Sequence, residues 1–372
     1  MAVELREVKT KADIKQFAIL PFEIYKGNTY WVPPVVADEM KALNPQYNPA
    51  FEFCKTKFLL AYKDGKCVGR IGAVINEKYN EKVNEKLVRF SRLEAFDDAE
   101  VFKTLINAAE AFGREQGMTK VHGPLGFTNL DTQGLLIEGF DYLPSIASVY
   151  HLPYYRKHIE ALGYEKENDW VEFRLTLTEH PVKKAARGAE LLKRRYGFTV
   201  RNFTSKKELE IYGPKVFEVL NDAFAELPYV ISFDDKMSSL YASKYFKVLN
   251  PRYTFVVEKD DELVGFLIGL PSLSEAMQKA KGRLFPFGFL HLLKALKHPK
   301  VIDLMLTGVL HKYHSSGAAV LLFAELQKTM LEDGIETMET TGIFETNTNV
   351  ITNWKNFENI QHKRRRCFVK AL

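Results

Sequence analysis

The chain has 372 residues, of which 46% are hydrophobic and 27% are charged, and its formal net charge at pH 7 is +5. This composition is typical of a folded globular protein and argues against intrinsic disorder. The charge is too small for this length to indicate a nucleic-acid partner, so we expect none.

The first half of the chain predicts a strand, a helix, a hairpin, a long helix, a strand, another helix and a closing strand. Leu5–Val8 is the first strand, and Thr10–Asp13 has the form of a capping box at a helix start. Asp64-Gly65 between two apolar runs predicts a tight hairpin. Ala99–Gln116 is an amphipathic helix that ends at a glycine, and Trp170–Leu175 is the closing strand.

The second half repeats this order, at an offset of about 196 residues. Three pairs of segments carry the similarity: Leu5–Asp13 with Val200–Glu208, Phe58–Gly72 with Phe255–Gly269, and Tyr155–Phe173 with Ile351–Val369. Three matches in the same order indicate two copies of one fold. The fold class predicted is α/β, with a mixed sheet and helices on its faces in each copy.

These patterns predict two domains joined by a helix. Residues 1–180 form the first domain, residues 181–196 a basic linker helix, and residues 197–372 the second domain. The basic run His362–Arg366 near the C-terminus is interpreted as a solvated strand edge or a surface tail.

Cysteine usage and the N-terminus indicate a reducing compartment. Cys54, Cys67 and Cys367 have no metal-ligand spacing, and we therefore expect no metal. The first residues lack the basic and then apolar pattern of a secretory signal, and no run of about 18 apolar residues predicts a membrane span. The expected location is the cytoplasm.

The turn before the long helix of the second copy is a candidate anion site. A helix start offers unpaired amides and a positive dipole end, and small residues allow a phosphate to approach. The residues concerned are Val309, His314, Ser315, Ser316, Gly317, Ala318 and Ala319. The structural alternative is an ordinary strand–turn–helix corner. In the first copy, the corresponding helix follows Glu94-Ala95-Phe96-Asp97-Asp98, whose carboxylates suit a helix start and would repel a phosphate.

With this strand order, the turn resembles the acyl-CoA loop of the GNAT N-acetyltransferase superfamily, Arg/Gln-x-x-Gly-x-Gly/Ala. Gly317 and Ala319 match that motif, whereas His314 stands where Arg or Gln is usual. The resemblance covers most of the chain as a tandem of two such domains. It implies that acyl-CoA is the co-substrate, that its diphosphate lies at Gly317 in the second copy, and that an amine is the acceptor.

A second superfamily motif, Asn-x-x-Ala-x-x-x-Tyr-x-x-x-Gly-Phe, is matched in frame from Asn347. The resemblance implies that Asn347 binds the pantetheine arm. Trp354 replaces the tyrosine that often protonates the leaving thiolate, and Glu358 replaces the glycine.

Several segments also resemble a narrower bacterial family of tandem GNAT proteins that includes ceramide synthase-like members. These segments are Tyr30–Pro34, Leu43–Pro45, His122–Pro124, Gly134–Leu136 and Gly282–Gly288. The resemblance implies transfer of a long fatty acyl group to a sphingoid-base amine, although the acyl group could equally be acetyl.

Transfer of an acyl group to an amine requires a base and a proton donor near the thioester. The candidates are Glu339 and Glu345, which flank the predicted strand-to-helix crossing, and Tyr313 in the loop. Each has a structural alternative: Glu345 could cap the helix at Asn347, and Glu339 could be solvated. A non-catalytic tandem protein that binds a ligand or partner is the alternative for the whole chain.

Residues 283–300 are aromatic, apolar and basic. Pro286 is expected to start a helix with Phe289, Leu292, Leu293 and Leu296 on one face and Lys294, Lys297 and Lys300 as its cations. Such a segment fits peripheral contact with the inner membrane face, or the lining of an acyl-chain channel. The alternative is a helix packed on the core.

Overall fold

The computed structural model describes residues 2–372, apart from the side chain of Asn356. The chain divides into two compact units. Unit 1 comprises Met1–Val171, Ser274–His291 and His362–Leu372, and unit 2 comprises Glu172–Leu273 and Leu292–Gln361. The residues expected as a linker are the helix α6 (Glu179–Tyr196), which packs against α11 (Ala318–Glu332) inside unit 2.

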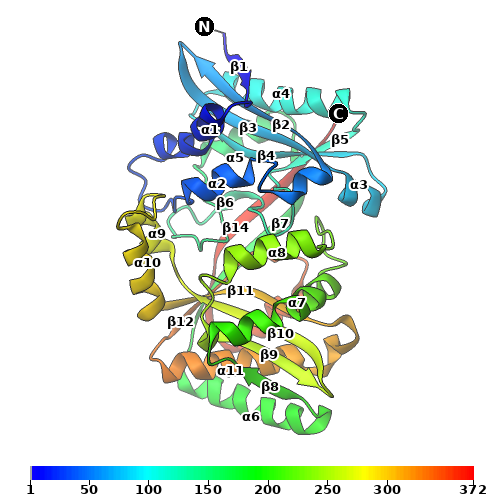
Figure 1. Cartoon of the computed structure of the whole chain (residues 1–372), viewed down its shortest axis with the longest axis vertical. Coiled ribbons are helices and arrows are strands. Elements are labelled where there is room, and N and C mark those ends of the chain that lie inside the picture. The colour runs from blue at the N-terminus through cyan, green and yellow to red at the C-terminus, as the bar shows by residue number, and fades with distance from the viewer. Residues whose placement is uncertain (1) are drawn as a thin grey trace. The chain divides into compact units, whose positions relative to one another are not determined.

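Unit 1 is a mixed sheet in the order β1-β2-β3-β4-β5-β14-β7, with helices on both faces (Figure 1). Its strands are β1 (Glu4–Glu7), β2 (Cys54–Lys63), β3 (Lys66–Asn76), β4 (Leu87–Ala95), β5 (Lys120–Gly123), β6 (Leu135–Glu138), β7 (Glu165–Thr176) and β14 (Glu358–Ala371). Its helices are α1 (Lys11–Ile24), α2 (Val36–Ala42), α3 (Glu77–Val83), α4 (Ala99–Glu115), α5 (Tyr154–Ala161) and α9 (Ser274–Ala280). The helix α10 (Gly288–Lys297) and the strands β7 and β14 are cut by the division.

Unit 2 repeats the scheme in the order β7-β12-β11-β10-β9-β8. Its strands are β8 (Thr199–Asn202), β9 (Thr254–Lys259), β10 (Glu262–Pro271), β11 (Val301–Val309), β12 (Thr337–Thr340) and the short β13 (Ile343–Phe344). Its helices are α6, α7 (Lys206–Ala223), α8 (Asp235–Tyr245), α11 and α12 (Thr348–Asn353). The predicted mixed α/β class is therefore confirmed.

The predicted local signals have the expected geometry. Thr10 accepts a hydrogen bond from the Asp13 N–H, and the Asp13 carboxylate accepts one from the Thr10 N–H, which completes the capping box. Both hairpin turns, at Asp64-Gly65 and at Asp260-Asp261, have positive φ at both central residues, as the twist of a tight hairpin requires.

Alternation along β2 explains why helices cover both faces of the sheet. Phe58 packs edge-on against Phe17 of α1, with ring centroids 5.7 Å apart. The next residue, Leu59, lies in the buried cluster that includes Phe102 of α4. Because successive strand side chains point to opposite faces, an apolar strand of this kind needs a helix on each side.

The closing strands are exchanged between the two repeats. β5 pairs antiparallel with β14 from the end of the second repeat, through Val121↔Lys370 and His122↔Val369. β12 pairs antiparallel with β7 from the end of the first repeat, through Met338↔Leu175. Each unit is thus completed by a strand from the other half of the sequence.

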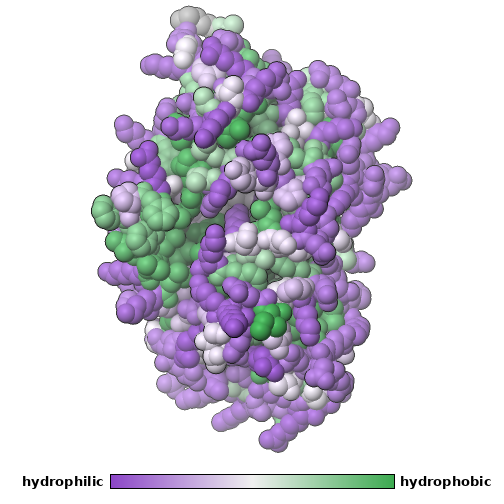
Figure 2. Space-filling view, viewed as in Figure 1, coloured by the Kyte–Doolittle hydropathy of each residue, from purple (hydrophilic) through white to green (hydrophobic). Residues whose placement is uncertain are grey.

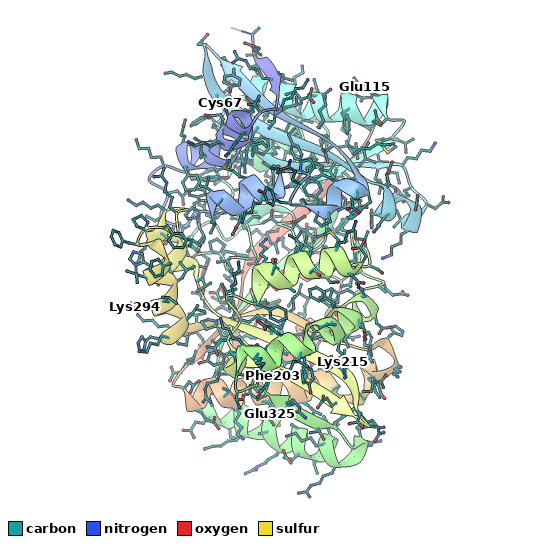
Figure 3. All side chains as sticks on the ribbon, viewed as in Figure 1. Cys67, Glu115, Phe203, Lys215, Lys294 and Glu325 are labelled. Atoms are coloured by element: carbon teal, nitrogen blue, oxygen red, sulfur yellow. The ribbon has the colours of Figure 1, made fainter. Side chains whose placement is uncertain are left out.

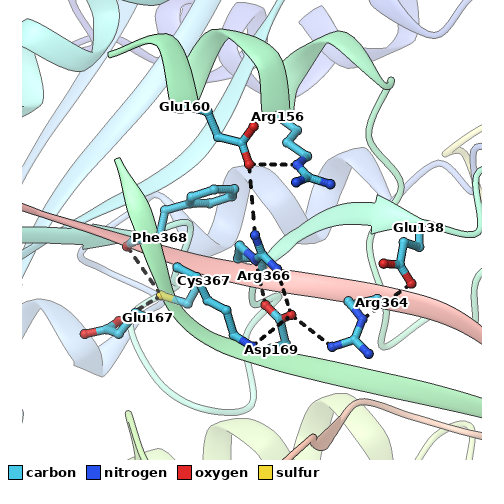
Figure 4. A network of polar contacts seen from close by, with 10 residues as sticks. Glu138, Arg156, Glu160, Glu167, Asp169, Arg364, Arg366, Cys367 and Phe368 are labelled. Carbon is cyan, nitrogen blue, oxygen red and sulfur yellow. Dashed lines mark hydrogen bonds and ion pairs between the residues drawn. The ribbon is translucent and has the colours of Figure 1, made fainter. Parts of the chain in front are cut away.

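The basic run His362–Arg366 is part of β14, so the expectation of a solvated edge or tail is wrong. His362, Lys363 and Arg365 are buried. Figure 4 shows how the remaining charges are balanced: Arg366 donates to Asp169 at 2.8 and 3.0 Å, and Arg364 donates to the same carboxylate at 3.0 Å. The arginines therefore pair with a buried carboxylate of β7 within unit 1, rather than with solvent.

Candidate functional site

Gly317 occupies the corner before α11, as predicted, with φ at +79°. A Cβ at this position would lie 2.8 Å from Cδ1 of Leu192, a residue of α6. The left-handed backbone and the nearby helix are each sufficient reasons for a glycine here. The glycine is therefore explained by packing inside unit 2, with or without a phosphate.

Side chains of the same loop satisfy much of its polar backbone. The His314 ring nitrogen Nε2 lies 2.9 Å from the Val309 carbonyl. The Ser316 hydroxyl donates to the Tyr313 carbonyl at 2.6 Å and accepts from the Ala318 N–H at 3.3 Å. Ser315 is exposed and Ala319 is half-buried in the first turn of α11. The amide of Ala318, one of the predicted loop residues, is thus already hydrogen-bonded to a neighbouring hydroxyl.

Two carboxylates lie against this loop. Asp222 of α7 accepts the His311 N–H at 2.6 Å, and Glu262 of β10 accepts from Lys312 at 2.6 Å and from the Tyr313 hydroxyl at 3.1 Å. Partial burial and the Glu262 carboxylate both raise the pKa of Tyr313. A phenol with a raised pKa is a weaker proton donor, and the acidic neighbours reduce the attraction of the loop for anions.

The predicted acids lie apart from this loop. Glu339 of β12 is buried and accepts from Nε of Arg174 at 2.7 Å. Its register partner across the parallel ladder is Asp303, six residues before Val309, which places the pair about 20 Å along β11 from the loop. Asp303 is also buried and was not singled out by its sequence context.

The remaining predicted residues lie around α12. Glu345 is in the turn between β13 and α12, and it is Asn347, not Glu345, that caps the helix: Asn347 Oδ1 accepts the Val350 N–H at 3.3 Å. Trp354 is buried and packs edge-on against Phe323 of α11 at 5.2 Å. The Asn347 amide and the Trp354 ring both therefore have structural roles in unit 2.

A cavity of about 150 Å³ lies inside unit 1, at the point where β4 and β5 separate. The two strands pair in parallel only from Leu87↔Lys120 to Arg89↔His122, after which β4 continues to Ala95 without β5 beside it. The cavity is lined from β4 by Arg92, Leu93 and Glu94 and from the chain after β5 by Pro124 and Leu125. The opening of a parallel pair thus creates the space.

The polar centre of this cavity is the carboxylate of Glu94. Oε2 of Glu94 accepts hydrogen bonds from the hydroxyls of Tyr155 at 2.6 Å and Tyr25 at 2.7 Å. Burial raises the pKa of Glu94, and the Arg70 guanidinium with the two hydroxyls offsets only part of that rise. A buried carboxyl with a raised pKa in a cavity is typical of a general acid or base.

Two arginines and a histidine also line the cavity, together with the hydroxyl-bearing Thr132, Ser145 and Ser148. Arg92 donates to the Glu39 carboxylate at 3.3 Å and has φ at +48°, an unfavoured backbone conformation for a residue with a side chain. Arg70 is buried, and it donates to the Phe17 carbonyl at 2.5 Å. Burial lowers the pKa of His151 to about 3, so this ring is neutral at physiological pH, and its Nδ1 accepts the Leu136 N–H.

The rest of the lining is mainly apolar. It includes Trp31, Val32, Ile146, Val149 and Met277. The volume of the cavity is below the range of about 300–1,000 Å³ that encloses a drug-sized ligand.

The start of α4, which follows β4 in the chain, is capped by a carboxylate. Asp98 Oδ1 accepts from the amides of Glu100 and Val101 at 2.9 and 3.3 Å, and Lys63 pairs with the other carboxylate oxygen at 2.7 Å. Of the carboxylates predicted at the start of α4, Asp98 therefore caps the helix and uses the amides that a phosphate would need, whereas Glu94 is bound by Tyr25 and Tyr155.

One further group of side chains has the chemistry of a metal site. Ligand atoms of His122, Glu167 and Cys367 lie within 4.8 Å of one another. Glu167 Oε2 is 3.2 Å from His122 Nδ1 and 3.1 Å from Cys367 Sγ. Hydrogen bonds account for these separations without an ion.

Two proteins match nearly the whole chain in sequence. Protein YghO of Escherichia coli (strain K12) is 29% identical over 99% of this chain and 95% of its own length. The bacterial ceramide synthase of Caulobacter vibrioides (strain NA1000 / CB15N) is 28% identical over 98% of this chain and 96% of its own length. No protein-family model matches the chain.

Solved structures share the architecture at low identity. A tandem GNAT protein from the clavulanic acid biosynthesis pathway superposes with a TM-score of 0.58 at 14% identity, covering 99% of this chain and 98% of that one. A GCN5-related N-acetyltransferase from Sphaerobacter thermophilus gives a TM-score of 0.53 at 12% identity, covering 99% and 95%. The chain therefore has the tandem GNAT fold, and the predicted resemblance to that superfamily is confirmed. The narrower resemblance is to proteins such as the Caulobacter ceramide synthase.

The segments Tyr30–Pro34, His122–Pro124 and Gly134–Leu136, which were singled out for their family resemblance, contribute to the cavity lining, but the charged and phenolic residues at its centre were not predicted to be functional. The available signal was a set of charged residues inside apolar strands: Arg70 in β3, and Arg92 and Glu94 in β4. A charged side chain in a strand that is covered on both faces must be buried or must face a cavity. Burying the charge costs free energy unless the charge is paired. Tyr25 and Tyr155 carried no comparable signal, because tyrosines are common in cores.

Proposed function

We propose that this protein is an N-acyltransferase that moves an acyl group from acyl-CoA to an amine, with Glu94 as the base. The observation that carries the proposal is the buried Glu94 carboxylate, which lies in a cavity where two parallel strands separate. The tandem GNAT fold supports this reaction class, and the match to a ceramide synthase supports an N-acyl product.

The side chains of the cavity supply the groups that this acyl transfer requires. The amine nitrogen attacks the thioester carbonyl carbon, the carbon–sulfur bond breaks, and coenzyme A leaves as a thiolate. Glu94 accepts the proton that the amine loses, for which a raised pKa is an advantage, and that proton then passes to the thiolate sulfur to give the thiol. The Tyr155 and Tyr25 hydroxyls hold the carboxylate in place, and the Arg92 cation can stabilise negative charge on the carbonyl oxygen.

The proposed acceptor is a long-chain lipid amine such as a sphingoid base, and the proposed acyl group is a long fatty chain, with acetyl as the alternative. The apolar side chains of Trp31, Ile146 and Met277 in the cavity wall suit contact with the hydrocarbon part of the acceptor that lies next to its amine. The ceramide synthase name belongs to a relative and extends to this chain only as part of the proposal.

Within unit 2, the Gly317 loop remains the proposed diphosphate site, as the sequence motif implies. Glu94 belongs to unit 1, so its assignment as the base does not depend on this loop. The predicted residues Glu339, Glu345, Tyr313 and Asn347 also belong to unit 2 and to the proposal for that unit.

The proposal is tested by an acyl-transfer assay with purified full-length protein. Acetyl-CoA and palmitoyl-CoA are each supplied with a sphingoid base, and release of the CoA thiol is followed. Glu94→Gln should lower kcat by about 100-fold or more, the usual contribution of a positioned base. The matched control is Glu115→Gln, an exposed glutamate at the far end of α4 that is labelled in Figure 3. Equal activity in both variants would exclude Glu94 as the base.

A non-catalytic ligand-binding protein is the second candidate, because the polar groups of the Gly317 loop already have partners in the protein. Thermal shifts distinguish the two. A ligand that binds only the native state raises the melting temperature. A shift with palmitoyl-CoA, without thiol release for any amine supplied, would favour the binding protein.

A further inference from the structure

A cluster of exposed apolar side chains lies between α9 and the middle of α10. Phe285 is 79% exposed, Phe287 71% and Leu290 50%, and Leu293, one turn further along α10, is 55% exposed. We refer to these four residues as the aromatic face. Figure 2 shows apolar residues gathered on the left of the molecule, where Figure 1 places α9 and α10. None of the described residues of α10 is buried, which argues against the expectation that this helix packs on the core.

The segment that carries the aromatic face is held firmly to unit 1. The Ser274 hydroxyl donates to the Pro144 carbonyl at 2.6 Å, and the Gln278 side chain donates to the carbonyls of Thr29 and Trp31 at 2.8 and 3.1 Å. The Gly282 carbonyl accepts the Val36 N–H at 3.1 Å. The two phenylalanines therefore project from an anchored base rather than from a free loop.

The charges along the segment that carries the aromatic face are mostly of one sign, although Lys279 lies 3.8 Å from the Glu275 carboxylate. Between Glu275 and Asp303 the sequence has no acidic residue, and it has six cations: Lys279, Lys281, Arg283, Lys294, Lys297 and Lys300. Lys294 is labelled on α10 in Figure 3 and is exposed. Exposed aromatic side chains that are flanked along the chain by cations are complementary to a bilayer surface that carries anionic headgroups.

We propose that the aromatic face docks on the surface of an anionic lipid bilayer. Phe285 and Phe287 enter the headgroup region, while the cations contact lipid phosphates. No helix among the described residues is long and apolar enough to cross a bilayer, so the contact is peripheral. Met277 of α9 lines the unit 1 cavity, and the same short segment therefore carries both the docking residues and a part of the cavity wall.

The test is sedimentation of the full-length protein with vesicles of phosphatidylcholine alone or mixed with phosphatidylglycerol. The wild type should bind the mixed vesicles, and added salt should weaken that binding. Phe285→Ser with Phe287→Ser should weaken it by at least about tenfold, since two large apolar side chains are lost from the contact. Because both residues are exposed, circular dichroism should show an unchanged melting temperature.

Matched controls are Leu191→Ser and Ile211→Ser, which alter apolar residues that are 69% and 70% exposed on other helices. These variants should bind like the wild type. Failure of the wild type to bind the mixed vesicles would overturn the proposal, as would equal binding by the double phenylalanine variant. If the double variant instead converts a dimer to a monomer in gel filtration, the face is an interface between two copies, and the bilayer proposal is wrong.

Discussion

The hydroxyl of Tyr155 lies 2.6 Å from Oε2 of Glu94 and also accepts the N–H of Ala95 at 3.2 Å. A single phenol thus holds both the side chain of Glu94 and the last backbone amide of β4. The cavity, its carboxylate and the end of the strand are therefore coupled through one residue of α5.

Tyr155→Phe should separate these roles. The Ala95 N–H loses a buried acceptor, which should cost about 1–3 kcal/mol of unfolding free energy. The Glu94 carboxylate loses a hydrogen bond that lowers its pKa, so the acidic limb of the kcat profile should move to higher pH. Urea unfolding and a pH–rate profile measure the two effects. A fall in stability with an unmoved acidic limb would separate Glu94 from the proton transfer.

Glu94 should also make stability depend on pH. Its folded pKa is raised above the unfolded value of about 4.3, so its contribution is fully present below that value and is lost as pH rises through the folded pKa. The amide side chain introduced by Glu94→Gln does not titrate. The unfolding free energy of this variant should therefore rise relative to that of the wild type as pH increases above about 4.3. A constant difference across this range would mean that the folded pKa is not raised.

Asp169 should have the opposite dependence. Burial raises the pKa of Asp169, but the hydrogen bonds from Arg366 and Arg364 outweigh burial and leave the pKa below its usual value. Its contribution is present above about pH 3.9, the unfolded value, and is lost as pH falls through the folded pKa.

Asp169→Asn leaves two arginines without their shared carboxylate and should cost about 3–5 kcal/mol at neutral pH. Glu138→Gln is the control, because Glu138 contacts Arg364 at 3.4 Å from an exposed position and should contribute less than about 1 kcal/mol. Denaturant midpoints at neutral pH measure both. Equally small losses of unfolding free energy in the two variants would mean that the Asp169 carboxylate does not stabilise β7 and β14.

Gly317→Ala tests the corner before α11. A Cβ at a φ of +79° costs about 1–2 kcal/mol, and its contact with Leu192 adds to that cost. Leu192→Ala in the same chain should recover the part due to the contact. Gly317→Glu also introduces a negative charge and should abolish any thermal shift caused by palmitoyl-CoA. A shift of wild-type size in a folded Gly317→Glu variant would place the diphosphate elsewhere.

Local patterns predicted most of the secondary structure, because the forces behind them act over a few residues. Thr10 caps its helix, Asp64-Gly65 turns its hairpin and Gly334 follows α11, as expected. The predicted helix at Asn347 is shorter, since α12 ends at Asn353.

The sequence by itself determined that the chain is a repeated mixed sheet with helices on its faces, since apolar periodicity and turn residues are local properties. Only the tertiary structure decided that β14 completes unit 1 and that β7 pairs with β12. A strand's sequence states which of its faces is apolar but not which neighbour accepts its hydrogen bonds. For the same reason, only the fold brought Tyr25, Glu94 and Tyr155 together from three distant segments around one cavity.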